Sequence, residues 1–318
     1  MNHSRGGAQR SAGPVISLDI GGTSIRGGIV TDGARPEVQL HHRQPTEAED
    51  GGPAVLRRAL AIAQNLHALV PETRGISVAC AGVIDPADGT VTSATELMPG
   101  WAGTDVGGAL RAQTGLNCTV LNDVHAHALG EFHYGAGRGC ASALVVAVGT
   151  GLGGGFLSGG QLVRGAGGLA GHVGHIHHPA ASGLRCTCGR SGHLESVASG
   201  SGLTARYQER RGANDPNATD GAAVAAHAAR GIQAAERALR VGGTALGECL
   251  GSLANAWAPE RIILSGSVTG AGDIWWQAVR EGYSASAMTP LQLRPIVLGE
   301  LGDDAPLIGA AAMHRSNA

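Results

Sequence analysis

Residues 15–30 read VISLDIGGTSIRGGIV, and this stretch decides the fold. The apolar run Val15–Ile20 predicts a β-strand, and the run Ser24–Val30 predicts a second one. Between them lies a short glycine-rich turn, made of Gly21, Gly22 and Thr23. The sequence thus predicts a hairpin whose turn can present backbone N–H groups to an anion.

A second stretch of the same form occupies residues 143–160 and reads ALVVAVGTGLGGGFLSGG. It predicts strand, turn and strand again, with Gly149, Thr150 and Gly151 in the turn. One such turn alone is equally well explained as a tight hairpin without a ligand, because glycine turns are common. Two Gly-Thr turns, each after an apolar strand, indicate two related lobes that together hold phosphate groups.

Length and composition limit the possible functions. The chain has 318 residues, enough for two lobes with a core each, and a net charge of −2, which gives no basic face for nucleic acid. All 23 basic residues are Arg, so Schiff-base chemistry and a Walker-A loop, which both need Lys, are excluded. Because no apolar run approaches the roughly 18 residues of a membrane span, we expect a cytoplasmic protein without a membrane partner.

Hydrophobic periodicity predicts further elements around an irregular segment at residues 162–192. The predicted helices are Val55–Leu69, Asp105–Thr114, Val124–Phe132, Ala222–Trp257 and Ala305–Ser316. The predicted strands are Gly75–Gly82, Asn117–Asp123 and Arg261–Ser267. Polar residues at the carboxyl end of such strands are where α/β sheets bind ligands.

Asp123 follows a predicted strand and precedes a predicted helix. An aspartate at such a junction is either a helix N-cap or a general base, and capping is the commoner role. If a sugar hydroxyl lies beside it, the carboxylate can take the hydroxyl proton during phosphoryl transfer. Asn122 would then hold an adjacent hydroxyl.

The segment from His172 to Glu195 is rich in metal-ligating side chains. Four of them, His175, Cys186, Cys188 and His193, can supply the closed tetrahedral set of a structural zinc site. The alternatives are a chance cluster and a catalytic zinc in a hydrolase, which would need an open coordination position and a nearby base. The other four cysteines are scattered among apolar residues, which argues against a disulfide framework.

Together these segments resemble the ROK family of sugar kinases and related repressors, across nearly the whole chain. The first hairpin is similar to the family's first phosphate motif, LNDVHAHALGE at 121–131 to its catalytic Asn-Asp segment, and VGTGLGGG at 148–155 to its second phosphate motif. GGLAGHVGH at 167–175 and CTCGRSGHLES at 186–196 are similar to its signature and its zinc segment.

The resemblance implies a fold and its ligands. The fold would be the α/β, actin-like (RNase H-like) ATPase fold of a two-lobed sugar kinase, with a small zinc-binding insertion at residues 175–193. Residues 1–122 would form the smaller lobe, with a C-terminal helix at about 305–318 packed back on it, and residues 123–304 the larger lobe. ATP, Mg²⁺, a structural Zn²⁺ and a sugar would bind, and family members are commonly homodimers.

The resemblance also implies a role for each motif residue. Asp123 would be the base for the C6 hydroxyl of the sugar, and Asp19 would help to hold Mg²⁺. The sugar contacts would be Asn122, His172, His175 and Glu195. The phosphate contacts would be Gly21, Gly22, Thr23, Gly149, Thr150 and Gly151, with Gly266 and Ser267 near the adenosine. The zinc ligands would be His175, Cys186, Cys188 and His193.

The chain departs from the family pattern at two positions. His193 stands where the family usually has a third cysteine, and His177 or His178 could compete with it as a ligand. His172 stands where many glucokinases of the family carry Glu, and this H-x-G-H pattern is similar to that of bacterial N-acetylmannosamine kinases. The residue favours N-acetylmannosamine over glucose or N-acetylglucosamine, because imidazole and carboxylate offer different hydrogen-bonding groups.

Two further alternatives belong to other functional classes. A repressor of the family would carry a helix-turn-helix module ahead of the first strand, and only fourteen residues precede Val15, so we expect no nucleic-acid partner. A catalytically silent sugar-binding protein is the other alternative. Asp123 and both phosphate turns argue against it.

Overall fold

The computed structural model describes residues 13–317, and the chain divides into two compact units. One unit extends to Gly130 and includes the residues from Asp304 onward, and the other comprises Glu131–Asp303. The chain therefore passes twice between the units, once within a helix and once just before the last helix.

The first unit is built on a five-stranded mixed sheet with the strand order β3-β2-β1-β4-β7. Its strands are β1 (Val15–Ile20), β2 (Ser24–Val30), β3 (Val38–Pro45), β4 (Ile76–Cys80) and β7 (Cys118–Asn122). The first three pair antiparallel, whereas β1, β4 and β7 run parallel. A two-stranded sheet of β5 (Val83–Ile84) and β6 (Val91–Ser93) lies in the same unit.

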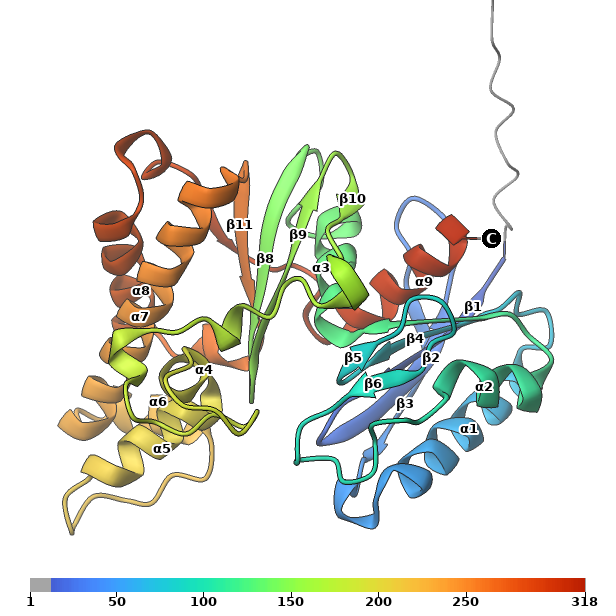
Figure 1. The fold of residues 1–318 in the computed structure, drawn as a ribbon, viewed down its shortest axis with the longest axis horizontal. Helices are drawn as coiled ribbons and strands as arrows, with labels where there is room; N and C mark the ends of the chain where they lie inside the picture. The colour runs from blue at the N-terminus through green and yellow to red at the C-terminus, as the bar shows by residue number, and fades with distance from the viewer. Residues whose placement is uncertain (1–12, 318) are drawn as a thin grey trace, which may run out of the picture. The chain divides into compact units, whose positions relative to one another are not determined.

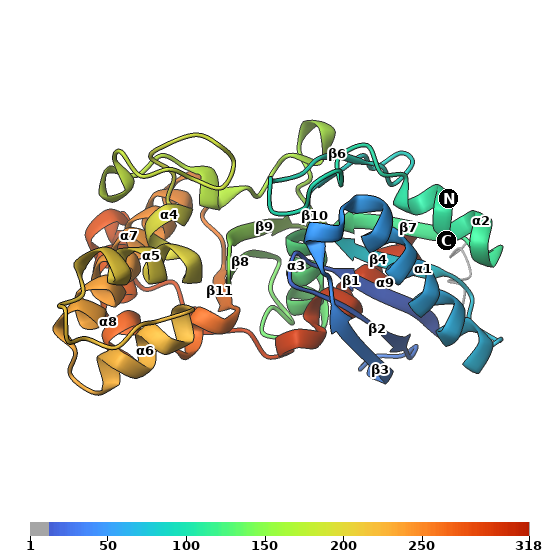
Figure 2. The same ribbon diagram turned by 90° about the horizontal axis from the view of Figure 1, so that it is seen from below.

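Helices cover both faces of this sheet, as Figures 1 and 2 show for α1 and α2 on one side and α9 on the other. These helices are α1 (Gly52–Leu69), α2 (Val106–Thr114) and α9 (Ala305–Asn317). α1 packs on β1 and β2, and α9 packs on β1, β4 and β7. The five residues of β4 are all buried because helices cover both of its faces.

The register of the parallel strands aligns the ends of three strands. Ile20 pairs with Cys80, and Cys80 pairs with Asn122, so β1, β4 and β7 end at the same level. The carboxyl ends of parallel strands form one edge, where α/β proteins bind ligands. The turn after β1 and the start of α3 (Asp123–Tyr134) therefore lie at one edge of the sheet.

The second unit contains another five-stranded mixed sheet, with the order β10-β9-β8-β11-β12. Its strands are β8 (Ser142–Val148), β9 (Leu152–Ser158), β10 (Gln161–Leu162), β11 (Arg261–Ser265) and β12 (Ile296–Leu298). Its helices are α4 (Glu195–Ala198), α5 (Gly200–Arg210), α6 (Gly221–Ala229), α7 (Gln233–Trp257) and α8 (Asp273–Ser286). α7 is the centre of this group, since α4, α5, α6 and α8 all pack against it.

Most sequence-predicted elements are confirmed, and both glycine-rich hairpins form with the expected partners. One prediction is wrong: Ala222–Trp257 is two helices, α6 and α7, instead of one. Gly231 between them has a φ of +79°, a left-handed conformation that an α-helix does not continue through. The elements not predicted from the sequence are β3, β5, β6, β10, β12, α4, α5 and α8.

Among the helices of residues 13–317, none is both long and apolar enough to cross a membrane.

Candidate active site

Asp19 is a buried carboxylate near the end of β1, with 6% of its surface exposed. Its side chain accepts hydrogen bonds from Nε and Nη2 of Arg26, the cross-strand partner on β2. Arg26 was not predicted as a site residue, although the register of the hairpin places it opposite Asp19. A carboxylate oxygen is the ligand type that Mg²⁺ prefers, so Asp19 fits the role implied for it.

Asp123 is the first residue of α3, directly after β7. Burial and, second to it, the charge of Asp19 raise the pKa of this carboxyl to about 7, against hydrogen bonds from Val124 and Asn122 that lower it. A carboxyl group with a pKa near neutrality is suited to accept a proton at physiological pH. Asp123 and Asp19 thus form an acidic pair at the carboxyl edge of the first sheet.

Asn122 provides most of the cap of α3. Its Oδ1 accepts hydrogen bonds from the backbone amides of Val124 and His125, at 3.0 and 3.2 Å. Its Nδ2 donates to the carbonyl of Gly82 at 3.0 Å and to Oδ1 of Asp123 at 2.9 Å. Asn122 therefore holds the catalytic candidate in place and takes most of the capping role, while Asp123 also accepts the amide of Val124 at 2.9 Å.

The first glycine turn lies at the same edge. Its ends are joined by a hydrogen bond from the amide of Gly21 to the carbonyl of Ser24, at 3.1 Å. Gly22 and Thr23 between them are exposed. The unit thus brings together the turn, Asp19 and Asp123, all of them predicted site residues.

The second glycine turn joins β8 and β9 and is anchored from behind by α5. The amide of Gly200 donates to the carbonyl of Gly149 at 2.7 Å, and the amide of Ser201 donates to that of Thr150 at 3.3 Å. Gly149 and Gly151 close the turn through a hydrogen bond of 3.0 Å.

Gly266 and Ser267 lie next to this turn. They follow β11, which runs parallel to β8, so both junctions fall at one edge of the second sheet. Gly266 has a φ of +90°, and a Cβ atom there would lie 2.5 Å from the carbonyl oxygen of Val148. Only glycine allows this close approach of the two backbones.

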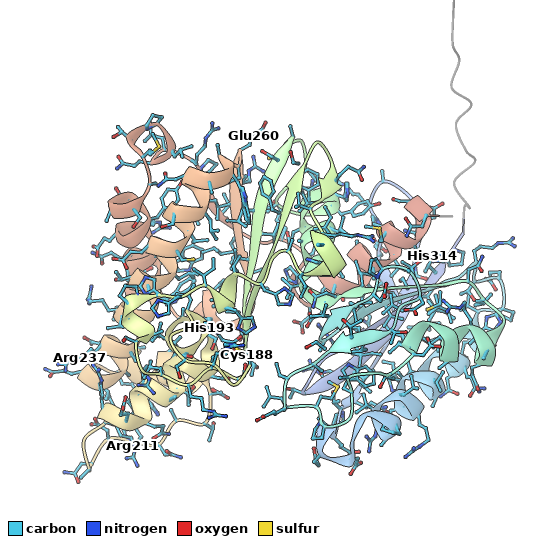
Figure 3. All side chains as sticks on the ribbon, viewed as in Figure 1. Cys188, His193, Arg211, Arg237, Glu260 and His314 are labelled. Carbon is cyan, nitrogen blue, oxygen red and sulfur yellow. The ribbon has the colours of Figure 1, made fainter. Side chains whose placement is uncertain are left out.

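The four predicted zinc ligands converge in the second unit. The ligand atoms of His175, Cys186, Cys188 and His193 all lie within 4.8 Å of one another. Sγ of Cys186 is 3.5 Å from Nδ1 of His175, and Sγ of Cys188 is 3.2 Å from Nδ1 of His193, beside which it lies in Figure 3. Zinc bonds of 2.3 Å to sulfur and about 2.05 Å to nitrogen place such atoms about 3.5 Å apart in a tetrahedron. The donor set and its spacing therefore fit Zn²⁺.

The neighbouring histidines do not join this cluster. Nδ1 of His178 accepts a hydrogen bond from the amide of Ala180 at 3.2 Å, and its Nε2 lies 3.1 Å from a carboxylate oxygen of Glu248. Both of its ring nitrogens are therefore engaged elsewhere, and His177 is not among the converging residues. Burial lowers the pKa of His175, which favours the neutral imidazole that binds metal ions.

Glu195 connects the cluster to the second glycine turn. Its Oε2 accepts the amide of Leu152 at 3.0 Å, directly after the turn, and its Oε1 accepts the hydroxyl of Thr187 at 2.7 Å. Thr187 lies between the two cysteines, so a bound metal would also fix this hydroxyl. Thr187 was not predicted as a site residue, although its position inside the C-x-C pattern distinguishes it in the sequence.

His172 stacks on His175, with 6.0 Å between the ring centroids. Its Nδ1 lies 3.0 Å from the carbonyl oxygen of Leu169. A carbonyl only accepts, so this nitrogen carries a proton and Nε2 of the neutral ring has a free lone pair.

The raised pKa of Asp123 has a consequence for stability. Its folded-state value of about 7 lies above the ordinary value of 3.8, so protonation favours the folded protein, and stability falls as the pH rises through 7. Asp123→Asn should therefore raise Tm by about 4 °C at pH 8, and the gain should shrink as the pH is lowered to 5. Thermal unfolding of both proteins across this range checks it. A difference in Tm that is constant with pH would contradict the assignment.

Comparison with known proteins gives relatives for the whole chain. A model of the ROK family matches residues 15–317. A glucokinase of Halalkalibacterium halodurans is 31% identical over 310 residues, 92% of each chain, and an N-acetylmannosamine kinase of Escherichia coli is 30% identical over 311 residues, 94% of this chain and 97% of the other. The crystal structure of a ROK family glucokinase from Streptomyces griseus in complex with glucose and AMPPNP matches with a TM-score of 0.82 and 27% identity, covering 95% of this chain and 99% of that one.

Proposed function

Because the chain belongs to the ROK family, we propose that it transfers the γ-phosphoryl group of ATP to the C6 hydroxyl of a hexose, with N-acetylmannosamine as the preferred acceptor. Its α/β fold with two mixed sheets matches the two-lobed kinases of the actin-like type. The main support for the proposal is the environment of Asp123. Its carboxyl group has a pKa of about 7 and lies at the same sheet edge as Asp19 and the first glycine turn.

In this proposal Asp123 is the general base. Its carboxylate accepts the proton of the C6 hydroxyl as the oxygen attacks the γ-phosphorus of ATP, and ADP leaves. Asn122 fixes one carboxylate oxygen of Asp123 through its Nδ2. An Asn122 contact to a sugar hydroxyl would replace one of its present hydrogen bonds.

The phosphate groups would be held by backbone amides and a cation. The proposed phosphate contacts are Gly21, Gly22 and Thr23 in the first unit and Gly149, Thr150 and Gly151 in the second. Asp19 would hold Mg²⁺, which supplies positive charge to the phosphates when bound. Gly266 and Ser267, beside the second turn, would lie near the adenosine.

The remaining sugar contacts would come from the histidine- and cysteine-rich segment. His172, His175 and Glu195 would meet the sugar hydroxyls. The zinc ligands would keep these side chains in place, because His175 is itself a ligand and Cys186 and Cys188 flank the partner of Glu195. Four protein ligands leave no open position, which supports a structural metal over a catalytic one.

The proposal is tested by a coupled ADP-release assay with Mg-ATP and four sugars: N-acetylmannosamine, N-acetylglucosamine, glucose and mannose. We expect the highest kcat/KM for N-acetylmannosamine. If glucose or N-acetylglucosamine is preferred, the kinase assignment stands and the substrate assignment is wrong. If the folded protein binds a sugar and none of the four releases ADP, the silent sugar-binding alternative is correct.

His172→Glu should change the sugar preference. In the wild-type protein Nε2 of His172 offers one acceptor, because Nδ1 is bound to the carbonyl of Leu169. A carboxylate offers two acceptor oxygens and a negative charge, so the ratio of kcat/KM for N-acetylmannosamine to that for glucose should fall by roughly tenfold. His177→Glu, an exposed neighbour outside the cluster, serves as the control and should keep the wild-type ratio. Equal ratios in all three proteins would remove His172 from the specificity determinants.

A further inference from the structure

We propose that Thr46 and Arg58 are positioning residues for the first phosphate turn, a role that rests on the proposed kinase function. The sequence motifs contain neither of them. Thr46 binds backbone carbonyls of the turn, and Arg58 binds the carbonyl of Thr46.

Thr46 binds the turn with two hydrogen bonds. Its hydroxyl donates to the carbonyl of Gly21 at 2.6 Å, and its amide donates to the carbonyl of Thr23 at 3.0 Å. Thr46 is fully buried, directly after β3, so its side chain has little freedom to leave this position. One residue thus binds both of these carbonyl oxygens.

These hydrogen bonds orient the amides of the turn. In a planar trans peptide the C=O of one residue and the N–H of the next point in opposite directions. When Thr46 holds the carbonyls of Gly21 and Thr23, the N–H groups of Gly22 and Ser24 must point away from Thr46. That is the arrangement in which a turn presents donors to a phosphate group.

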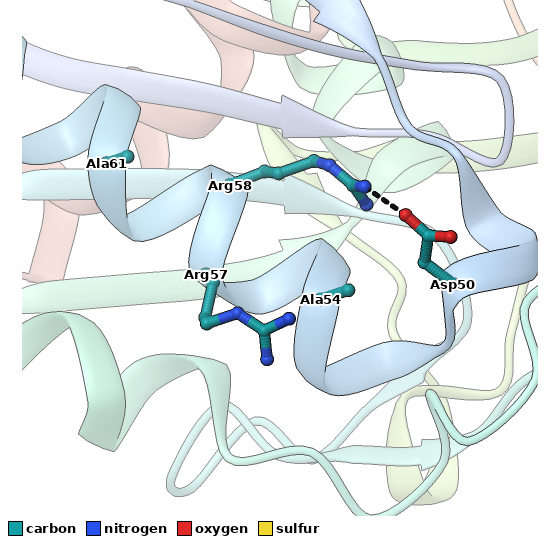
Figure 4. Close-up of a pocket in the computed structure, with 5 residues that line it drawn as sticks. All are labelled: Asp50, Ala54, Arg57, Arg58 and Ala61. Carbon is teal, nitrogen blue, oxygen red and sulfur yellow. Dashed lines mark hydrogen bonds and ion pairs between the residues drawn. The ribbon is translucent and has the colours of Figure 1, made fainter.

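Arg58 on α1 supports Thr46 from behind. Its Nη1 donates to the carbonyl of Thr46 at 2.9 Å, and its Nη2 forms ion pairs with Asp50 and Glu47. Arg58 and Asp50 both line a surface pocket of about 580 Å³. Figure 4 marks the contact between them, whereas Arg57, the preceding residue of α1, has no contact drawn. The ion pairs fix the guanidinium, and the guanidinium fixes the carbonyl of Thr46.

The backbone beside Thr46 is strained. Glu47 has a φ of +49°, a left-handed conformation that a non-glycine residue rarely adopts. Such a conformation persists where surrounding contacts enforce it, and it is common at functional sites. Arg58 supplies these contacts through the side chain and the carbonyl of Glu47.

The carbonyls of the second glycine turn are also held by hydrogen bonds, but the donors are backbone amides. There the carbonyls of Gly149 and Thr150 are bound by the amides of Gly200 and Ser201, which are backbone groups at the start of α5. By the same peptide geometry, the amides of Thr150 and Gly151 point away from α5. Both turns thus have their carbonyls bound from behind, but only the first depends on side chains that mutation can remove.

The test uses four variants in two matched pairs. Thr46→Val removes the hydroxyl and keeps the amide, whereas Thr46→Ser keeps both. Arg58→Leu removes the guanidinium that supports Thr46, and Arg57→Leu removes the neighbouring exposed one. The probe is MgADP, with its Kd measured by calorimetry on the full chain. Because loss of one hydrogen bond has a modest effect, we expect Kd to rise about fivefold in Thr46→Val and in Arg58→Leu. Thr46→Ser and Arg57→Leu should stay within about twofold of wild type.

Steady-state kinetics separates positioning from general damage. In Thr46→Val the KM for ATP should rise while the KM for the sugar stays unchanged. If Thr46→Val fails to fold, the Kd of Arg58→Leu for MgADP, compared with that of Arg57→Leu, decides the proposal. Equal Kd values in Thr46→Val and wild type, equal weakening in Thr46→Val and Thr46→Ser, or a matching rise in the sugar KM would overturn the proposal.

The two proposals fail in different ways. If the wild-type protein binds MgADP and transfers no phosphate to any sugar, the proposed function fails and the Kd values still decide the role of Thr46. If the wild-type protein binds no MgADP, both are wrong.

Discussion

Replacing Asp123 by Asn is expected to lower kcat by about 10³-fold, since general acid–base catalysis contributes between 10² and 10⁴. The amide has nearly the same shape as the carboxylate and cannot take the proton of the sugar hydroxyl. The carboxylate also accepts hydrogen bonds from Asn122 and Val124, which an amide oxygen can retain. The loss should therefore appear in kcat, with the KM for the sugar changed by less than about threefold.

The pH profile identifies the group responsible. In the wild-type protein kcat should rise with pH, with a midpoint near the Asp123 pKa of about 7, because only the ionised carboxylate is a base. The residual activity of the Asn variant should lack this step. Asp105→Asn is the matched control, because Asp105 caps α2 in the same unit and accepts the amide of Gly108. If Asp123→Asn keeps wild-type kcat, or if the control loses as much, Asp123 is not the base.

Loss of zinc is expected to have the largest effect on stability. Cys186→Ser removes one of four converging ligands, and apparent binding free energies of structural zinc are about 10 kcal/mol or more, so the ordered segment around His172 and Glu195 should be lost with the metal. We expect zinc content to fall from one ion per chain to nearly none, Tm to fall by about 10 °C, and activity to disappear. Elemental analysis, thermal unfolding and the ADP-release assay measure the three effects.

Two further variants sharpen this test. Cys249→Ala changes a buried cysteine of α7 outside the cluster and should keep its zinc. His193→Cys restores the ligand usual in the family and should also keep zinc and activity. Activity that disappears on chelation and returns with metal, without any change in folding, would contradict a structural site and favour the zinc hydrolase alternative.

The local parts of the site were predictable from the sequence. The two hairpins follow from apolar runs around glycine turns, and the position of Asp123 follows from a strand that runs directly into a helix. The four predicted zinc ligands lie within 19 positions of one another, His175 to His193, so a few turns suffice to bring them together. Residues that are close in sequence can be brought together by local turns alone, so their proximity can be predicted without knowledge of the tertiary structure.

Features that depend on distant contacts were not predictable. Thr46 reaches Gly21 across 25 positions of the chain, and His178 is removed from the ligand set by Glu248, a residue on α7. β3 was missed because only its first residue is buried, so its sequence lacks the alternation of a half-buried strand. The break at Gly231 was missed because the flanking alanines favour helix on both sides.

The proposed reaction is transfer of the γ-phosphoryl group of ATP to the C6 hydroxyl of a hexose, with N-acetylmannosamine as the preferred acceptor. The most direct test is to incubate the wild-type protein with Mg-ATP and N-acetylmannosamine and to record the phosphorus NMR spectrum, proton-coupled, of the products. We expect ADP together with an equal amount of a sugar phosphomonoester whose phosphorus couples to the two C6 protons. ATP that remains intact, or that yields only ADP and inorganic phosphate, would contradict it.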